Sequence, residues 1–352
     1  MNNKKRVLFV LKRRDDYNAK LHSHIGMSTG LYNSASFMHQ MLIDKDVESK
    51  LVVVADNNGI DKEVTLYKPT HVIIEALWVV PTKFAVLQKL HPDVTWIIRL
   101  HSETPFIAGE GIAMDWIGEY SSFRNIVIAC NAPRFLHDIR SYLKSRNNWT
   151  KSTTEEKVIY LPNYYPQQYK SKKFDYNKDY IDIGCFGAVR PLKNHLTQAF
   201  AAIQFADKIK KKLRFHVNAG RIEMRGQAVL NNLKGLFEQI SGQGHELINH
   251  QWCPREDFLK ICASMDIGLQ SSISETFNIV GADIISQGVP LVGSNEIPWI
   301  TRWASADPTS SEDIALKLHA AYEHPYINAL FNRKNLTKYT NETAKIWVKY
   351  FT

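Results

Sequence analysis

Two acids follow a short apolar run in the second half of the chain. Glu275 comes soon after the run at 265–270, and Asp283 comes eight positions later. The pattern predicts a buried strand at 265–270, a helix that begins at Glu275 and ends at Gly288, and a further strand that opens at Pro290. Open parallel sheets bind small molecules at the carboxyl ends of their strands, so these acids indicate a site for a polar ligand. The alternative is that Glu275 is only a helix N-cap, favoured by the helix dipole.

Two cations form the other part of this candidate site. Arg190 and Lys193 follow the apolar run 181–186, where a strand should turn into a helix, and Gly187 lies in that turn. Free backbone N–H groups and the helix dipole favour an anion at a helix start. Two cations at this position would neutralise a departing diphosphate as negative charge builds up in a transition state. The competing interpretation is a pair of solvated cations on an exposed loop.

The elements that must position these groups form two series. A chain of 352 residues exceeds a single typical core, so we expect two domains. Short β-branched runs alternate with amphipathic segments, which is typical of βαβ units and of an α/β fold with parallel sheets. The polar, proline-containing stretch at 166–180 interrupts this alternation and is predicted to be a linker. The expected domains are 1–165 and 181–327, and the last segment, 328–352, is expected to form a closing helix.

The individual elements follow from the same patterns. In the first series we expect strands at 7–11, 51–55, 71–76, 95–100, 125–129 and 157–161, and helices at 28–43, 82–90 and 133–144. In the second series we expect strands at 181–186, 213–218, 245–248, 266–270 and 291–294.

Composition excludes several classes of protein. A hydrophobic fraction of 44% and a charged fraction of 22% are those of an ordinary globular protein. The four cysteines show no CxxC spacing, which argues against a zinc site or a disulfide scaffold and indicates a reducing compartment. No apolar run approaches the ~18–20 residues of a membrane helix, and the run at 7–11 is too short for a signal peptide. We therefore expect a cytoplasmic protein.

Charge leaves the partner open. The net charge of +9 is compatible with a polyanionic partner, with peripheral contact to an anionic membrane surface, or with a generic basic protein. The sequence makes no prediction of an oligomeric state.

Polar groups also follow two predicted strands of the first half. Lys12, Arg13 and Arg14 leave the first strand, and a loop that carries His24 leads to Gly30 at a helix start. A glycine in such a loop lets backbone amides approach a phosphate or a sugar.

His101 directly follows the predicted strand at 95–100, and Glu103 adds a further polar group there. A lone histidine is more often structural, but its place at a strand's carboxyl end favours a functional role.

The acidic stretch resembles the nucleotide-sugar site of glycosyltransferase family 4, a family with the GT-B fold. Its members have two glutamates separated by seven residues and then a Gly-x-Pro strand; Glu275 and Asp283 keep this spacing, and Gly288-Val289-Pro290 follows. Arg190 and Lys193 match the family's Gly-x-x-Arg-x-x-Lys segment after the linker. The resemblance implies two Rossmann-like parallel-sheet domains that face a cleft, and a C-terminal helix that crosses back to the first domain.

The resemblance also implies roles. Glu275 and the backbone after it would hold the donor sugar, Asp283 the ribose, and Arg190 with Lys193 the diphosphate, while His101 would line the site of transfer. The other expected donor contacts are Gly30, Gly187, Gly220, Arg221, Trp252, Thr276, Phe277, Asn278 and Ile279, and the expected acceptor contacts are Lys12, Arg13, Arg14, His24 and Glu103.

Some positions depart from the family pattern. Asp283 replaces the second glutamate, Asn278 stands where a glycine is usual, and Gly26 and Gly30 are apart instead of paired. Trp252 lies where the family's base-binding loop sits, although plain core packing would explain it equally well.

These observations predict a retaining transfer from a UDP-sugar co-substrate. The sequence contains no metal-ligand cluster and no DxD motif at a strand edge, so we expect no metal ion and no cofactor. Basic residues cluster at 12–14, 170–173 and 208–214, and if the first two clusters border the cleft mouth, a phosphate-rich acceptor such as DNA follows. In length and Asn/Lys-rich composition the chain also resembles phage DNA-modifying glycosyltransferases, and this resemblance implies hydroxymethylated pyrimidines in phage DNA as the acceptor. A cell-envelope glycan or lipid-linked acceptor remains an alternative, as does a nucleotide-sugar-binding protein without transferase activity.

Overall fold

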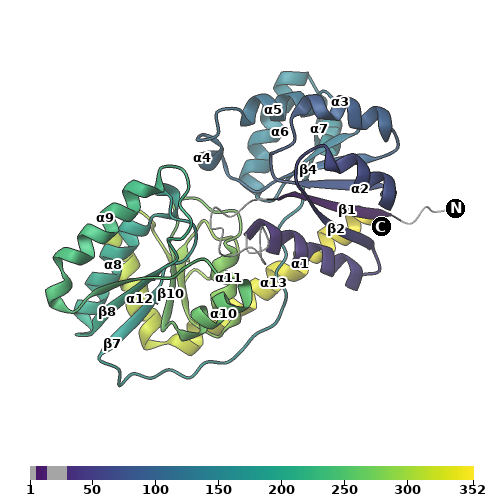
Figure 1. Cartoon of the computed structure of the whole chain (residues 1–352). Helices are drawn as coiled ribbons and strands as arrows, with labels where there is room; N and C mark the ends of the chain where they lie inside the picture. Colours follow the sequence, from purple (N-terminus) through teal and green to yellow (C-terminus); the bar gives the residue numbers. More distant parts are fainter. Residues whose placement is uncertain (1–4, 14–29) are drawn as a thin grey trace. The chain divides into compact units, whose positions relative to one another are not determined.

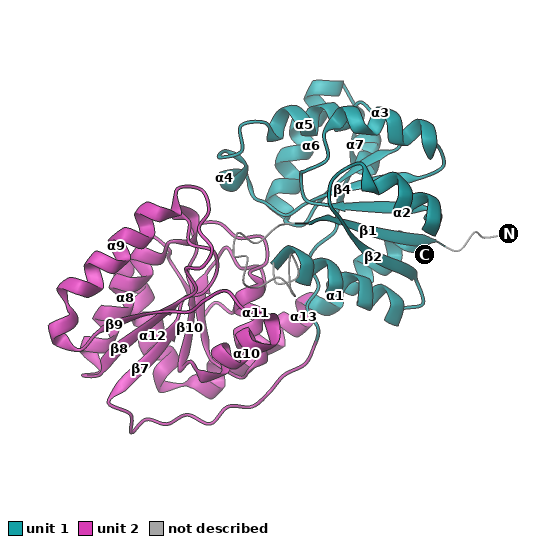
Figure 2. Cartoon of the chain, in the orientation of Figure 1, with its two compact units in different colours: residues 1–166, 340–352 teal, residues 167–339 magenta. Residues whose placement is uncertain are grey.

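The chain folds into two compact units (Figure 2). The structure is a computed structural model that describes residues 5–13 and 30–352. Unit 1 comprises Met1–Pro166 and Thr340–Thr352, and unit 2 comprises Gln167–Tyr339. The described segment 161–179, which passes from unit 1 into unit 2, contains neither helix nor strand.

Unit 1 contains a six-stranded parallel sheet with the order β2-β1-β3-β4-β5-β6 (Figure 1). Its strands are β1 (Arg6–Lys12), β2 (Glu48–Val54), β3 (His71–Glu75), β4 (Thr95–Leu100), β5 (Ile126–Cys130) and β6 (Val158–Tyr160). Along β1, Leu8 and Val10 pack into one core cluster and Val7 and Phe9 into another. This alternation arises because successive side chains point to opposite faces of a sheet that is covered on both sides.

The helices of unit 1 connect these strands. They are α1 (Gly30–Asp44), α2 (Gly59–Tyr67), α3 (Pro81–Leu90), α4 (Thr104–Ile107), α5 (Ala113–Tyr120), α6 (Pro133–Asn147) and α7 (Lys151–Lys157). The sequence predicted α1, α3 and α6. It missed α2, α4, α5 and α7 because these helices have only four to nine residues, too few turns to display a helical period.

Unit 2 contains a second six-stranded parallel sheet, with the order β12-β11-β10-β7-β8-β9. Its strands are β7 (Tyr180–Gly184), β8 (Lys212–Val217), β9 (Glu246–Asn249), β10 (Ile267–Gln270), β11 (Leu291–Ser294) and β12 (Ser305–Ala306). Its helices are η2 (Pro191–Lys193), α8 (His195–Lys208), α9 (Gly226–Gln239), η3 (Ser241–Gln243), α10 (Arg255–Ser264), α11 (Ile279–Ser286) and α12 (Ser311–Glu323). Both sheets have the doubly wound form of nucleotide-binding folds.

The last helix, α13 (Pro325–Phe351), belongs to both units. In unit 2, the Asn328 side chain accepts a hydrogen bond from the backbone N–H of Leu291 at 2.8 Å. From Thr340 onwards the helix lies in unit 1, where Trp347 and Phe351 are buried in the same core cluster as β1. The predicted closing helix that returns to the first domain is confirmed, and it starts at Pro325 instead of residue 328.

Candidate active site

The predicted cations and the first acid lie at the point where the strand order of the unit 2 sheet reverses. This point falls between β7 and β10, which are adjacent and parallel. Arg190 and Lys193 follow β7, and Glu275 follows β10. A backbone hydrogen bond from Ile273 to Leu192, 2.9 Å long, joins the two loops. Doubly wound sheets bind ligands at this position, so the fold itself marks the two loops as a site.

Lys193 and Glu275 form an ion pair across the two loops. The same carboxylate oxygen accepts hydrogen bonds from the Ser272 hydroxyl at 3.0 Å and from the Asn278 amide at 3.2 Å. The side chains of Lys193 and Glu275 are only 12% and 9% exposed. A carboxylate held by a lysine, a hydroxyl and an amide is rigidly placed, which is what orientation of a polar ligand requires.

The sequence predicted that the helix begins at Glu275, and this prediction is wrong. α11 begins at Ile279, and Asn278 is its N-cap, with its side-chain oxygen accepting from the Gly281 N–H at 2.7 Å. The interpretation of Glu275 as a helix cap is therefore also wrong. Asn278 has a φ of 61°, a left-handed conformation that glycine and asparagine tolerate better than other residues. Asparagine thus keeps the backbone shape that a glycine would give at this position.

The other residues predicted beside Glu275 differ in accessibility. Thr276 and Ile279 are partly exposed. Phe277 is 2% exposed, its ring packs near that of Trp299, and its carbonyl accepts a hydrogen bond from the Trp299 indole at 2.7 Å. Its side chain belongs to the core and is therefore not available to a ligand.

Arg190 pairs with Glu223, an acid that the sequence did not single out. Glu223 binds Arg190 at 2.8 Å through one oxygen and Arg221 at 2.5 Å through the other. The backbones of the two loops pair as well, because Val189 N–H donates to the Arg221 carbonyl at 2.9 Å. One carboxylate therefore holds two arginines next to the site.

Gly187 lies in the turn between β7 and η2. Its φ of 118° is one that residues with a side chain rarely adopt. A Cβ at this position would lie 3.6 Å from Cε of Lys193, and the Gly187 N–H donates to the Asn218 side chain at 2.7 Å. The turn therefore brings the backbone close to the lysine of the ion pair.

Gly220, Arg221 and Trp252 meet beside the same loops. A Cβ on Gly220 would lie 3.0 Å from the backbone nitrogen of Trp252, a tight contact that the absence of a side chain on Gly220 avoids. The Arg221 guanidinium lies 5.6 Å from the centre of the Trp252 ring. Trp252 is partly exposed and not a core residue, in contrast to the core-packing interpretation.

Asp283 occupies the second turn of α11 and is 2% exposed. One of its oxygens binds the Arg255 guanidinium at 2.6 Å. Arg255 begins α10 and is the more exposed member of the pair, at 27%. Arg255 could not be predicted from the sequence, because its partner lies 28 positions away.

In unit 1, His101 belongs to a buried charge cluster at the ends of β3 and β4. Its Nε2 lies 2.5 Å from one oxygen of Glu75, and Nη1 of Arg99 lies 3.1 Å from each oxygen. Glu75 and Arg99 are both fully buried, at 0%. Burial and then the nearby Arg99 lower the pKa of His101, although Glu75 opposes them. Because Glu75 holds Nε2, the ring of His101 has a fixed orientation, which suits a role in orienting a ligand.

The remaining predicted residues of unit 1 are more scattered. Lys12 and Arg13 are exposed at the end of β1, and Gly30 opens α1. Arg14 and His24 lie outside the described residues. Glu103 is 5% exposed and binds Arg134 at 3.3 Å, so it is placed mainly as a structural partner.

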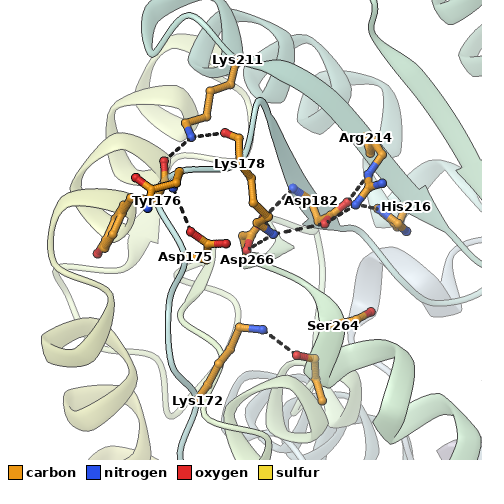
Figure 3. A network of polar contacts seen from close by, with 12 residues as sticks. Lys172, Asp175, Tyr176, Lys178, Asp182, Lys211, Arg214, His216, Ser264 and Asp266 are labelled. Atoms are coloured by element: carbon orange, nitrogen blue, oxygen red, sulfur yellow. Dashed lines mark hydrogen bonds and ion pairs between the residues drawn. The ribbon is translucent and has the colours of Figure 1, made fainter.

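Two of the basic segments bind the protein's own backbone (Figure 3). Lys172 donates to the carbonyl of Ala263 at 2.6 Å, and Lys211 donates to the carbonyls of Tyr176 and Lys178. These lysines fasten the segment that precedes β7 to unit 2. Arg214 of β8 binds both oxygens of Asp182 at 2.6 and 2.7 Å. These cations therefore stabilise unit 2, which removes part of the reason for assigning them to a phosphate-rich partner.

The residues that the structure describes contain neither a metal-binding cluster nor a membrane-spanning helix. Within 5–13 and 30–352, no group of three or more His, Cys, Asp or Glu side chains is arranged to hold a metal ion. In the same part of the chain, no helix is long and apolar enough to cross a membrane.

The two doubly wound sheets and the shared closing helix define the GT-B fold, which is the fold of this chain. Its structural neighbours are GT-B glycosyltransferases. Trehalose-6-phosphate synthase OtsA matches with a TM-score of 0.71 and 12% identity over 98% of this chain and 98% of that chain. Sucrose-phosphate synthase from Thermosynechococcus elongatus matches with a TM-score of 0.68 and 10% identity over 99% of this chain and 98% of that chain.

A third neighbour was solved with ligands. Anabaena Alr3699/HepE, in complex with UDP and glucose, matches with a TM-score of 0.58 and 11% identity over 98% of this chain and 100% of that chain. No protein-family model and no curated protein matches the sequence. At these identities the similarity establishes the fold.

Proposed function

We propose that this protein is a retaining glycosyltransferase that moves a sugar from a UDP-sugar to a hydroxyl group of an acceptor. The observation that carries the proposal is the Lys193–Glu275 pair at the reversal point of the unit 2 sheet. The neighbour solved with UDP and glucose supports UDP as the nucleotide.

The Lys193–Glu275 pair is suited to exchange its partners for a nucleotide-sugar. Both groups are mostly buried, where an unpaired charge would be costly, and they neutralise each other. A nucleotide-sugar offers an anionic diphosphate to the ammonium group and neutral hydroxyl groups to the carboxylate. We therefore assign Lys193 to the diphosphate and Glu275, with the backbone N–H groups that follow it, to the sugar.

Arg190 supplies the second positive charge. The bond between the anomeric carbon and the diphosphate oxygen breaks as the acceptor oxygen bonds to that carbon, and the departing diphosphate gains negative charge. Cations that are already fixed stabilise this charge without reorganisation, and Glu223 holds Arg190 in place. The diphosphate can accept the acceptor's proton, so the reaction requires no side-chain base, and we propose that the two cations act without a metal ion.

The rest of the assignment follows the positions of the side chains. We assign Asp283, held by Arg255, to the ribose, and Arg221 with Trp252 to the nucleotide base. His101, which Glu75 orients, is the residue of unit 1 that we assign to the acceptor.

Two classes of acceptor are candidates for this reaction. Hydroxymethylated pyrimidine in phage DNA is one candidate, although Lys172 and Lys211 bind carbonyls of unit 2 and do not support it. A lipid-linked or polysaccharide acceptor at the cell envelope is the second candidate. It is favoured by an exposed surface of aromatic and basic residues on unit 2, which is described below.

The test is a matrix of donors and acceptors. The protein is incubated with a panel of UDP-sugars and with hydroxymethylated DNA, plain DNA, lipid-linked glycans or no acceptor, and both released UDP and transferred sugar are measured. Binding of UDP is measured separately by calorimetry. The proposal is overturned if the protein binds UDP but neither transfers sugar to any of the acceptors nor hydrolyses any UDP-sugar. That result would support a non-catalytic nucleotide-sugar-binding protein.

Variants connect the activity to the site. Lys193→Ala and Arg190→Ala are each expected to lower turnover by at least ~10²-fold, the scale of losing a transition-state charge partner. The matched control is Lys234→Ala, which removes an exposed lysine on α9. Turnover by both site variants at the level of the control would remove the assignment.

A further inference from the structure

An apolar stripe runs along the exposed side of the first half of α13. Tyr326, Ile327, Leu330 and Phe331 are 58%, 45%, 47% and 44% exposed. They recur at i, i+4 spacing and so share one side of the helix. The opposite side is buried, as shown by Leu336 at 0%. The stripe is therefore an apolar surface on a helix whose opposite side packs into the protein.

The stripe continues onto the neighbouring loop after β11. Trp303 is 72% exposed, and its ring centre lies 5.8 Å from that of Phe331. On the other flank, Phe174 of the segment before β7 lies 5.0 Å from Tyr326, ring centre to ring centre. We call the surface formed by Trp303, Tyr326, Ile327, Leu330 and Phe331 the aromatic face.

The segments that build the aromatic face carry cations and no acid, and the acids next to them in the sequence include Asp175 and Glu323. These three segments are 167–174, 300–306 and 325–339. Their cations are Lys170, Lys172, Lys173, Arg302, Arg333, Lys334 and Lys338, of which Lys172 and Arg333 also donate to backbone carbonyls of unit 2. Lys334 lies 5.8 Å from the Phe331 ring, so the charge lies directly beside the apolar groups.

We propose that the aromatic face docks the protein on an anionic lipid surface. Exposed tryptophan, tyrosine and aliphatic side chains flanked by lysines suit the boundary between headgroups and acyl chains, where each part finds its preferred surroundings. The cations add attraction to anionic lipids. This inference goes beyond the proposed transfer reaction, because it uses no residue of the β7–β10 site.

Other occupants fit the chemistry less well. A second copy of the chain in a two-fold interface would bring the same cations against each other, since both partners present the same patch. A nucleic acid would match the cations but would leave Ile327, Leu330 and Trp303 without an apolar partner. An anionic bilayer satisfies both the charge and the apolar groups.

The experiment is cosedimentation of the full chain with vesicles. One vesicle is pure phosphatidylcholine, and the matched vesicle has part of it replaced by phosphatidylglycerol. We expect binding to the phosphatidylglycerol vesicle, weakened by added salt because the charge attraction is screened. Trp303→Gln combined with Phe331→Gln is expected to lower the partition coefficient by about tenfold or more. The control pair is Leu66→Gln with Leu316→Gln, two exposed leucines outside the face at 67% and 53%.

A charge-reversal pair separates the electrostatic part. Lys334→Glu with Lys338→Glu is expected to abolish the preference for phosphatidylglycerol, while Lys62→Glu with Lys234→Glu, of the same net charge, is expected to keep most of it. All variants are checked for folding by circular dichroism and for UDP binding by calorimetry, which are expected to be unchanged. The proposal is overturned by the absence of vesicle binding, or by equal loss in face and control variants. It is also overturned if the face variants instead abolish self-association in light scattering or DNA binding in gel shifts.

Discussion

Replacing Glu75 by glutamine is expected to destabilise unit 1 by about 3 kcal/mol, the lower end of the range for removing one partner of a buried ion pair. The Glu75 carboxylate is bound by Arg99 at 3.1 Å through both oxygens and faces His101 at 2.5 Å. Both Glu75 and Arg99 are 0% exposed, so the neutral variant leaves the Arg99 charge without a counterion away from water. We take the lower end because the glutamine oxygen still accepts one hydrogen bond.

The pH dependence gives a second, independent signature. Burial alone would raise the pKa of Glu75, but Arg99 and His101 outweigh it, so the pKa in the folded protein lies below the ordinary value of 4.5. A depressed carboxyl pKa contributes stability that is fully present above about 4.5 and is lost as the pH falls through the folded value. Glu75→Gln lacks this contribution, so the stability gap between the two proteins is expected to shrink in acid.

The assay is urea unfolding of the full chain, followed by both tryptophan fluorescence and circular dichroism because two units need not unfold in one step. The control is Glu63→Gln, which removes a more exposed ion pair with Lys50, 3.1 Å long, and is expected to cost less than about 1 kcal/mol. Equal losses for Glu75→Gln and Glu63→Gln, or a stability gap that does not change with pH, would refute the reasoning.

Two further predictions concern the backbone of the site. In Gly226→Ala, the new Cβ would lie 1.9 Å from the Val189 carbonyl oxygen, so the loop that carries Arg190 must shift and turnover is expected to fall by about 10²-fold. Gly235→Ala on the same helix, with nothing within 4 Å, is expected to keep full activity, and equal activities would contradict the account. Asn278→Ala removes the N-cap side chain and places alanine at a φ of 61°, which alanine tolerates poorly. We therefore expect the free energy of unfolding, measured in urea, to fall by about 1–2 kcal/mol. Asn278→Gly should cost less, and an equal cost would exclude a role for the left-handed conformation.

The sequence predicted the fold because its strands are unusually clear. β3 and β4 are almost continuous β-branched and apolar runs, as expected for strands that are covered on both faces. The short helices α2, α4, α5 and α7 were not predicted, since a helix of few turns gives no periodic signal.

The start of α11 shows where local pattern fails. The polar residues around Glu275 look like a cap, but Phe277, which lies before the helix, is buried next to Trp299. The helix instead starts at Ile279, after this tertiary contact.

The sequence predicted most of the charged residues of the site but not the ion pairs that they form. Lys193 and Glu275 were both expected, and they lie in contact although they are 82 positions apart. The partners of Arg190, His101 and Asp283, which are Glu223, Glu75 and Arg255, were not expected. No motif marks these three residues. Each can be recognised only from its ion pair with a charge on a distant segment of the chain, which the fold brings close.

The path of α13 has a consequence for biosynthesis. Trp347 stacks on Phe9 with ring centres 6.0 Å apart, and its indole donates to the Pro162 carbonyl at 2.9 Å. The first sheet to leave the ribosome therefore lacks part of its interior until nearly the whole polypeptide has been translated, while Gln167–Tyr339 is contiguous and can close earlier. A nascent chain stalled before Thr340 would expose that unfilled surface. We therefore expect the N-terminal segment of unit 1 to bind chaperones during synthesis.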